Sequence, residues 1–327
     1  MTNSDDTRLS LLHDWLKENF GNLEYTLKPV SGDASFRRYF RFKSDQHQLI
    51  AVDSPPDKES NEAFVHVTHL LAAEGVAVPH IHYCSLDFGF FLLSDFGDRL
   101  LLDSLNDKNA NDLYAMALDS LITIQQTPAE SLSLYDQTLL QQEMELFREW
   151  FIKKHLKINL NHDENEHLNT VFQILADDAL QQPQVFVHRD YHSRNIMTIE
   201  NETLGIIDYQ DSVKGPITYD LVSLLRDCYI SWPDEKVYAL CLSFYEMLKT
   251  QGAVQHIDES TFIKFFDLMG IQRHLKAVGI FSRLNIRDNK SNYLNDIPRT
   301  LNYIRLIAKK YTETEKLAEI ISSRVNI

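Results

Sequence analysis

Residues 184–208 constrain the fold of this chain more than any other segment, because polar residues stand there at fixed offsets between short, strand-like apolar stretches. His188, Arg189 and Asp190 come first, Asn195 follows after four further residues, and Asp208 ends the next apolar stretch. Transfer of a phosphoryl group from ATP needs one carboxylate to hold the acceptor hydroxyl, and an amide and a second carboxylate to hold Mg²⁺. We therefore predict that Asp190 orients the acceptor and that Asn195 and Asp208 bind Mg²⁺. The alternative is a surface turn whose polar residues cap backbone groups.

The composition narrows the range of partners. The 327 residues carry 47 Asp and Glu against 32 Lys and Arg, a formal net charge of −15. A chain this acidic repels nucleic acid and anionic membranes, so we expect neither as a partner. The three cysteines (Cys84, Cys228 and Cys241) are too scattered for a disulfide framework. The acidic N-terminus lacks the apolar region of a secretion signal, and no apolar run is long enough to span a bilayer. We expect a soluble, cytoplasmic protein, and the sequence leaves its oligomeric state open.

Glycine positions exclude two common nucleotide-binding folds. The ten glycines lie at least eight residues apart. Neither the dinucleotide fingerprint Gly-x-Gly-x-x-Gly nor a Walker A loop can be formed from such a distribution. If ATP binds, it is held by another kind of loop.

Hydrophobic patterns divide the chain into two parts. The first part is expected to contain a helix at 8–20, strands at 25–30, 36–42, 48–52, 81–84 and 90–93, and a helix at 58–74. The second part is expected to contain helices at 111–126, 136–156, 167–180, 217–228, 233–250, 260–287 and 298–310. A last helix is expected after a capping box formed by Thr312 and Glu315. The pattern predicts an α+β fold with an antiparallel-sheet lobe at residues 1–95 and a larger, mainly helical lobe at 96–327.

Several motifs occur in order along almost the whole chain, at residues 36–41, 53–56, 92–98, 188–197, 207–211, 215–221, 223–227, 272–276 and 287–288. On these motifs the chain resembles the bilobal protein-kinase-like fold, and specifically the aminoglycoside/choline phosphotransferase family. Within that family it is most similar to the bacterial anomeric kinases that act on N-acetylmuramate and N-acetylglucosamine in cell-wall recycling.

The resemblance implies an ATP- and Mg²⁺-dependent sugar kinase with its active site in the cleft between the two lobes. It implies that residues 94–97 are the hinge that meets the adenine, with Asp95 and Phe96 among the ATP-binding residues. Glu62 is implied as the helix carboxylate that pairs with a phosphate-binding cation. Arg194 and Asp211 are assigned to the substrate.

The chain departs from the kinase pattern at two places. Protein kinases hold the ATP phosphates with a Lys on the third strand, and residues 49–53 contain none. Arg38 or Arg41 on the neighbouring strand can supply the charge instead, because guanidinium groups suit phosphate oxygens. The alternative is that both arginines lie on the solvent face of an edge strand. The glycine-rich loop is reduced to Gly32, so the backbone amides of residues 32–35 are expected to cover the phosphates.

A basic stripe stands out in the acidic chain. Residues 272–287 contain Arg273, Lys276, Arg283 and Arg287 and no Asp or Glu. Their spacing places all four on one face of a helix. The stripe predicts a cationic wall for an anionic substrate, such as the lactyl carboxylate of N-acetylmuramate. The alternative is a solvated face, or one that packs against acidic residues of the same lobe.

Two other functions stay open at this point. One is phosphorylation of an aminoglycoside or an amino alcohol, although such cationic acceptors call for an acidic pocket. The other is a catalytically inactive, ATP-binding regulatory module. The missing third-strand Lys favours the inactive module, whereas the presence of Asp190, Asn195 and Asp208 counts against it.

Overall fold

The structure is a computed structural model that describes residues 6–21, 23–30, 36–199 and 203–325. The chain forms two compact units. The sheet unit contains Met1–Arg99 and Met197–Asp211, and the helical unit contains Leu100–Ile196 and Ser212–Ile327. In this division the first unit ends at Arg99 rather than at residue 95, and it also takes in a later segment. The assignment of separate roles to the two lobes stays a prediction.

The sheet unit is built on five antiparallel strands in the order β1-β2-β3-β5-β4. The strands are β1 (Thr26–Pro29), β2 (Arg38–Lys43), β3 (Gln48–Asp53), β4 (Ile81–Ser85) and β5 (Phe90–Ser94). Alternating apolar residues in these short runs predict such strands, and all five expected strands are present.

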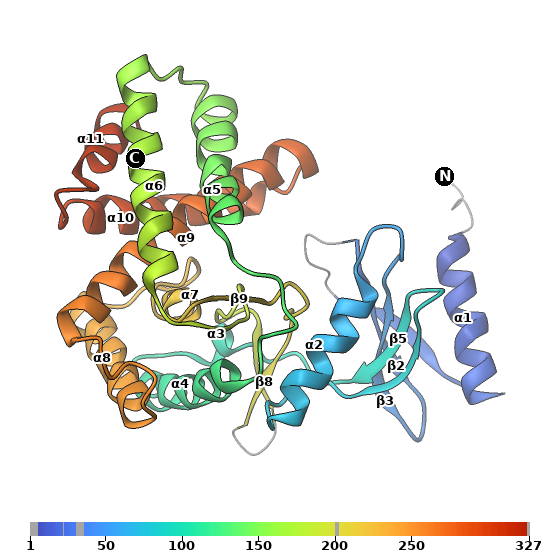
Figure 1. Cartoon of the computed structure of the whole chain (residues 1–327). Coiled ribbons are helices and arrows are strands. Elements are labelled where there is room, and N and C mark those ends of the chain that lie inside the picture. The colour runs from blue at the N-terminus through green and yellow to red at the C-terminus, as the bar shows by residue number, and fades with distance from the viewer. Residues whose placement is uncertain (1–5, 22, 31–35, 200–202, 326–327) are drawn as a thin grey trace. The chain divides into compact units, whose positions relative to one another are not determined.

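One helix covers each face of this sheet (Figure 1). Helix α1 (Thr7–Phe20) packs its Leu12 and Leu16 against Phe40 and Phe42 of β2. Helix α2 (Asn61–Ala73) packs Phe64 against the opposite face, which carries Val52, Phe91 and Leu93. Successive residues of a strand point to opposite faces of the sheet. Within each strand, alternate side chains therefore contact α1, and those between them contact α2.

The helical unit contains the remaining helices and two short strands (Figure 1). Its helices are α3 (Leu101–Ser104), α4 (Ala110–Gln126), α5 (Gln137–Leu146), the π-helix η1 (Phe147–His155), α6 (His162–Gln181), α7 (Tyr219–Leu225), α8 (Asp234–Thr250), α9 (Glu259–Asp288), the 3₁₀-helix η3 (Ser291–Asp296), α10 (Ile297–Ala308) and α11 (Glu315–Arg324). These two strands, β6 (Gln184–Val187) and β9 (Val213–Pro216), pair with each other. The other strand pair, β7 (Ile196–Thr198) and β8 (Leu204–Ile206), falls in the later segment that belongs to the sheet unit, apart from Ile196. An antiparallel sheet followed by a mainly helical region confirms the predicted α+β class. Across the described ranges, no helix is both long and apolar enough to cross a membrane.

Two expected helices differ in detail from the structure. The single helix expected at 136–156 is an α-helix that widens to a π-helix after Leu146. At this point Gly279 of α9 approaches so closely that a Cβ on it would lie 2.4 Å from the backbone of Leu146. The capping box of Thr312 and Glu315 is wrong, because α11 begins at Glu315 with Thr314 as its N-cap. The Thr314 hydroxyl donates to the carbonyl of Ala308 at 3.0 Å, so it satisfies the preceding turn instead.

Candidate active site

The loop between β6 and β7 carries the His-Arg-Asp motif and is anchored by Asp220 at the start of α7. The two oxygens of this carboxylate accept hydrogen bonds from the backbone N–H groups of His188 (2.7 Å) and Arg189 (3.0 Å). Asp220 is fully buried, and burial raises its pKa to about 7 although both backbone donors act in the opposite direction. The buried carboxylate of Asp220 therefore fixes the backbone of the two residues that precede the candidate base Asp190.

Internal hydrogen bonds fix the turn that follows Asp190. The backbone N–H of His192 (3.0 Å) and the side-chain Nδ2 of Asn195 (3.1 Å) both donate to the backbone carbonyl of Asp190. Ser193 donates its N–H and hydroxyl to Asp227 at 2.9 and 2.5 Å. In the part of the chain that the structure describes, no hydrogen bond or ion pair holds the Asp190 carboxylate. The loop thus uses the backbone of Asp190 and leaves its side chain to an acceptor.

Basic side chains determine the charge state of the Asp190 carboxylate. Burial alone would raise its pKa, but Lys276, His192, Arg273 and Arg189 lower it to about 2. Lys276 and Arg273 come from α9, and Arg189 belongs to the loop itself. Asp190 is therefore ionised at neutral pH, the state in which a carboxylate can act as a general base.

Glu143 of α5 holds two of these cations, and the sequence analysis missed it. Its carboxylate forms ion pairs with Arg189 and with Lys276, the latter at 3.1 Å, and accepts a hydrogen bond from Tyr135. Burial opposes ionisation, but the charges of Lys276 and Arg189 lower the pKa of Glu143. A signal was present, because Glu143 shares the buried stripe of its helix with Leu140 and Met144. A lone carboxylate at an apolar helical position requires a buried cation as its partner.

The basic stripe of α9 is divided between different environments. Arg273 and Lys276 are only 5% and 8% exposed, so a solvated face is wrong for these two. Lys276 packs against an acidic residue of the same unit, as the second alternative expected. Arg283 is partly buried, and Arg287 is exposed and forms an ion pair with Asp288 at 2.8 Å.

Arg273 is a buried guanidinium without a carboxylate partner among the described residues. Its Nη1 lies 3.7 Å from the Sγ of Cys228, which is a weak acceptor, and its Nε has no hydrogen-bond partner within those same residues. Burial lowers its pKa, but the charges of neighbouring groups, including Asp190 and Asp227, outweigh that effect and raise it. An uncompensated buried cation of this kind is a candidate site for a substrate anion.

The other two residues assigned to the substrate lie in different units. Arg194 places its guanidinium 3.7 Å from the centre of the Tyr229 ring in the helical unit. Asp211 is exposed at the end of the sheet unit. Both assignments stay predictions.

The candidate Mg²⁺ ligands offer hard oxygen atoms. Asn195 donates its Nδ2 to the loop, which directs its Oδ1 away from that carbonyl. Asp208 accepts a hydrogen bond from Gln210 at 2.9 Å and has a φ of 64°, in the left-handed region that non-glycine residues rarely adopt. Arg189 also has a positive φ, of 75°. Backbone strain of this kind is typical of functional sites. A carboxamide and a carboxylate suit Mg²⁺, which takes its other ligands from water and substrate phosphates.

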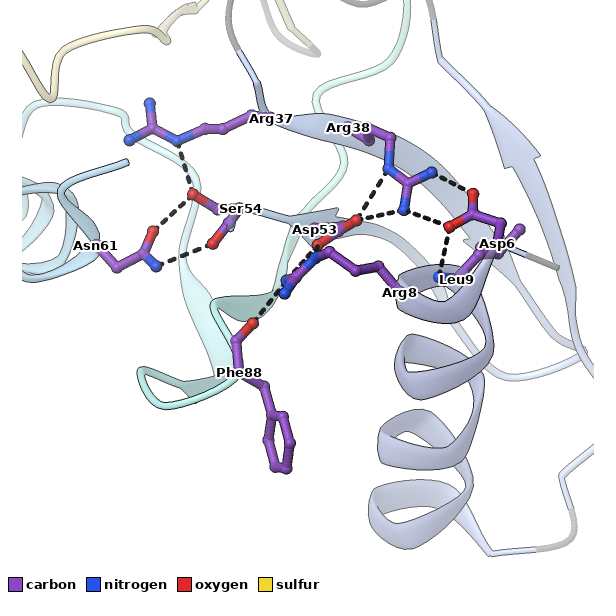
Figure 2. A network of polar contacts seen from close by, with 9 residues as sticks. All are labelled: Asp6, Arg8, Leu9, Arg37, Arg38, Asp53, Ser54, Asn61 and Phe88. Carbon is purple, nitrogen blue, oxygen red and sulfur yellow. Dashed lines mark hydrogen bonds and ion pairs between the residues drawn. The ribbon is translucent and has the colours of Figure 1, made fainter. Parts of the chain in front are cut away.

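The two arginines proposed for the ATP phosphates are engaged with carboxylates. Arg38 forms ion pairs with Asp53 and Asp6, and Asp53 also accepts a hydrogen bond from Arg8 of α1 at 2.7 Å (Figure 2). Arg41 bonds Asp95 at 2.7 Å and Asp98 at 2.8 Å. β2 lies between β1 and β3, so the expected edge position of these arginines is wrong.

Three further predicted ATP-binding residues have defined surroundings. The Asp95 carboxylate accepts hydrogen bonds from Arg41, Gln48 and the Gly97 N–H, which ties residues 94–98 to the sheet. The Phe96 ring packs against Gly205, where a Cβ would lie 2.5 Å from it. Glu62 is exposed in the first turn of α2. Gly32 lies outside the described residues.

Comparisons with known proteins identify the family of the chain. Residues 26–253 match the phosphotransferase enzyme family. The chain belongs to this family. It is 39% identical to the N-acetylmuramate/N-acetylglucosamine kinase of Pseudomonas putida, over 97% of this chain and 96% of that protein. A kinase of the same name from Neisseria meningitidis is 35% identical, over 95% of this chain and 94% of the relative.

Solved structures share the fold at low sequence identity. An ethanolamine kinase from Plasmodium vivax has a TM-score of 0.64 at 12% identity and covers 99% of this chain and 93% of its own. An ADP-bound aminoglycoside phosphotransferase, APH(2'')-Ib, has a TM-score of 0.60 at 14% identity, over 90% and 97% of the two chains. The predicted protein-kinase-like fold is thereby confirmed.

Proposed function

We propose that this phosphotransferase moves the γ-phosphoryl group of ATP to the anomeric hydroxyl of N-acetylmuramate or N-acetylglucosamine. The product is a sugar 1-phosphate, and ADP is released. The observation that carries the proposal is 39% identity, over nearly the whole length, to a kinase named for these two sugars. The His-Arg-Asp loop supports it, because neighbouring basic groups lower the pKa of Asp190 and keep it a carboxylate, the form that a hydroxyl-orienting base needs.

In this mechanism Asp190 accepts a hydrogen bond from the acceptor hydroxyl and aims its oxygen at the γ-phosphorus atom. The sugar oxygen forms the new P–O bond while the bond from the γ-phosphorus to the β–γ bridging oxygen breaks. The hydroxyl proton passes to Asp190 and then to solvent. An anomeric hydroxyl is more acidic than an ordinary alcohol, so a single oriented carboxylate suffices as the base.

Asn195 and Asp208 are the residues that would hold Mg²⁺, and the ion would neutralise charge on the β- and γ-phosphates. Their roles in this chain are orientation and oxygen donation. Asn195 is held by its bond to the Asp190 carbonyl, and Asp208 by its bond from Gln210.

The charges around Asp190 favour an uncharged or anionic acceptor over a cationic one. Arg273 and Lys276 both lie close enough to lower the pKa of Asp190, and Arg273 has no carboxylate partner among the described residues. A protonated amino group beside these cations would be repelled, which argues against aminoglycosides and amino alcohols.

The proposal is tested by incubating the protein with Mg²⁺, ATP and each candidate acceptor, and by following ADP release and the phosphorus NMR spectrum. We expect turnover with N-acetylmuramate and N-acetylglucosamine, and a product phosphorus coupled to the anomeric proton. A phosphate ester at C6 contradicts the proposed regiochemistry. Turnover of an amino alcohol or aminoglycoside, but of neither sugar, would overturn the acceptor class. ATP binding without turnover of any acceptor would indicate an inactive module.

A further inference from the structure

The third strand of the sheet has lost the basic residue on which protein kinases rely. In protein kinases, a Lys on the third strand holds the ATP phosphates and pairs with a Glu on the following helix. In this chain the only charged residue of β3 is Asp53, which is fully buried and bonded to Arg8 and Arg38. The strand thus ends in a carboxylate paired with two arginines, whereas the third strand of protein kinases carries a positively charged Lys.

Arg37 occupies a different face of the sheet from Arg38. Arg38 is the first residue of β2, and Arg37 immediately precedes it. The two side chains point in opposite directions, Arg38 toward Asp53 and Asp6, and Arg37 toward Ser54 and Asn61 (Figure 2). Arg38 therefore meets the N-cap residue of α1, whereas Arg37 lies over Phe64 of α2.

Polar partners on that face hold the Arg37 guanidinium. Its Nε donates to the hydroxyl of Ser54 at 3.2 Å, and its Nη2 forms an ion pair with Glu59 at 3.3 Å. Only 4% of the Arg37 side chain is exposed, and Glu59 also accepts a hydrogen bond from the Phe36 N–H at 3.0 Å. Ser54 in turn donates to Asn61 at 2.6 Å, so the network joins the ends of β3 and α2. Like the kinase pair, this pair joins a cation to a carboxylate, here a buried Arg37 and a partly buried Glu59, although the residues come from other positions.

The same guanidinium lies beside the candidate metal segment of the sheet unit. Its Cζ is 5.7 Å from the centre of the Phe64 ring, and Phe64 stacks on Tyr209 with ring centres 5.6 Å apart. Tyr209 directly follows Asp208, and Thr68 of α2 donates to its hydroxyl at 3.0 Å. Arg37 is therefore connected, through Phe64 and Tyr209, to the residue next to the predicted Mg²⁺ ligand Asp208.

We propose that Arg37 binds the polyphosphate of the nucleoside triphosphate in place of the missing third-strand Lys, and that Glu59 positions it. This inference rests on the proposed ATP-dependent function. In this assignment Arg37 takes the role first predicted for Arg38 or Arg41, each of which forms ion pairs with two carboxylates. Glu59, which lies just before α2, takes the role first predicted for Glu62.

The test compares the affinities of ATP and adenosine in the presence of Mg²⁺, measured by calorimetry on the full chain. Adenosine lacks phosphates, so the ratio of the two affinities isolates the polyphosphate contacts. We expect Arg37→Met to weaken ATP binding by about tenfold to a hundredfold, the scale of hydrogen bonds to a charged group, and to leave adenosine binding unchanged. A structural role would weaken both ligands together or neither.

Matched variants sharpen the comparison. Arg38→Met removes the neighbouring charge from the same strand and should lower the melting temperature without changing the ratio. Glu59→Gln should lower the ratio less than Arg37→Met, because the cation remains but is less well held. Arg37→Gln keeps a donor for Ser54 without the charge, and it carries the same expectation if the Met variant does not fold.

The outcomes separate this inference from the proposed function. If the wild-type protein phosphorylates the sugars and both Arg37 variants keep the wild-type affinity ratio, the inference is wrong while the function stands. If no sugar is phosphorylated but the ratio falls in the Arg37 variants alone, the phosphate site stands and the acceptor assignment is wrong. A ratio that falls equally in Arg38→Met overturns the assignment to Arg37.

Discussion

The side-chain Nδ2 of Asn195 donates a hydrogen bond to the backbone carbonyl of Asp190 at 3.1 Å. The candidate metal ligand and the candidate base are thus joined through the backbone, five residues apart on one loop. Because this bond does not involve the carboxylate of Asp190, the side chain can be replaced without removing it. A substitution of the Asp190 side chain can therefore test its chemical role while the loop keeps this hydrogen bond.

Replacing Asp190 by Asn should lower kcat by about a hundredfold to ten-thousandfold and leave the affinity for ATP nearly intact. The amide keeps the shape of the side chain but cannot accept the hydroxyl proton, and positioned acid–base groups contribute on this scale. Steady-state kinetics and ATP calorimetry on the variant measure the two effects. Wild-type turnover would remove Asp190 from the mechanism.

Replacing Asp208 by Ala should abolish the Mg²⁺ dependence of nucleotide binding, because it removes a charged oxygen ligand from the ion. Calorimetric titration with ATP at several Mg²⁺ concentrations measures it. Gln210→Ala is the matched control, since Gln210 donates to Asp208 at 2.9 Å and supplies no charge. It should keep the metal dependence. Equal behaviour of the two variants would mean that Asp208 is not a metal ligand.

Replacing Arg273 by Ala should raise KM for N-acetylmuramate by about tenfold or more and barely change KM for N-acetylglucosamine, which has no lactyl carboxylate. The expected size is that of one hydrogen bond to a charged group. Arg287→Ala is the control from the same helix, because its guanidinium is exposed and paired with Asp288. Equal effects of Arg273→Ala on both sugars would show that the buried guanidinium does not read the carboxylate.

Replacing Asp178 by Asn should make stability less dependent on pH. Burial raises the pKa of Asp178 to about 7, against a usual value of 3.8. Between these values the folded chain holds a proton that the unfolded chain has released, so this group makes the free energy of unfolding fall as pH rises, and the loss is complete above about pH 7. The Asn variant lacks this loss, so its stability relative to wild type should increase from pH 5 to pH 8. Urea unfolding at both pH values measures the difference, with the exposed neighbour variant Asp177→Asn as control.

The strands and most helices could be predicted because alternation and helical periodicity record burial directly. Phe40 and Phe42 repeat every second residue, and Leu12 and Leu16 every fourth, so sequence spacing alone identifies the buried faces. The break after Leu146 could not be predicted, because the apolar pattern of residues 136–156 continues through it. The residue that packs against the backbone at this point is Gly279, which is more than a hundred residues away in the chain.

In the site, the motifs predict the candidate base and metal ligands. They do not predict the residues that form hydrogen bonds or ion pairs with the site. Asp190 and Asn195 stand in a recognisable order, but nothing near them in the chain names Glu143 as the partner of Lys276. Glu59 could not be predicted as the partner of Arg37 either. It lies three residues before Glu62, the carboxylate expected to pair with a cation. Spacing identifies the face of a helix, and only tertiary packing decides which carboxylate reaches a given cation.

The contact between Gly279 and Leu146 lies three residues along α9 from Lys276 and three residues along α5 from Glu143. A methyl group at position 279 has no room between the two backbones, so a larger residue there must push α9 away from α5. Such a separation lengthens the ion pair of Glu143 and Lys276, which is 3.1 Å long one turn away. A glycine that bears no functional group thus sets where a cation stands beside Asp190.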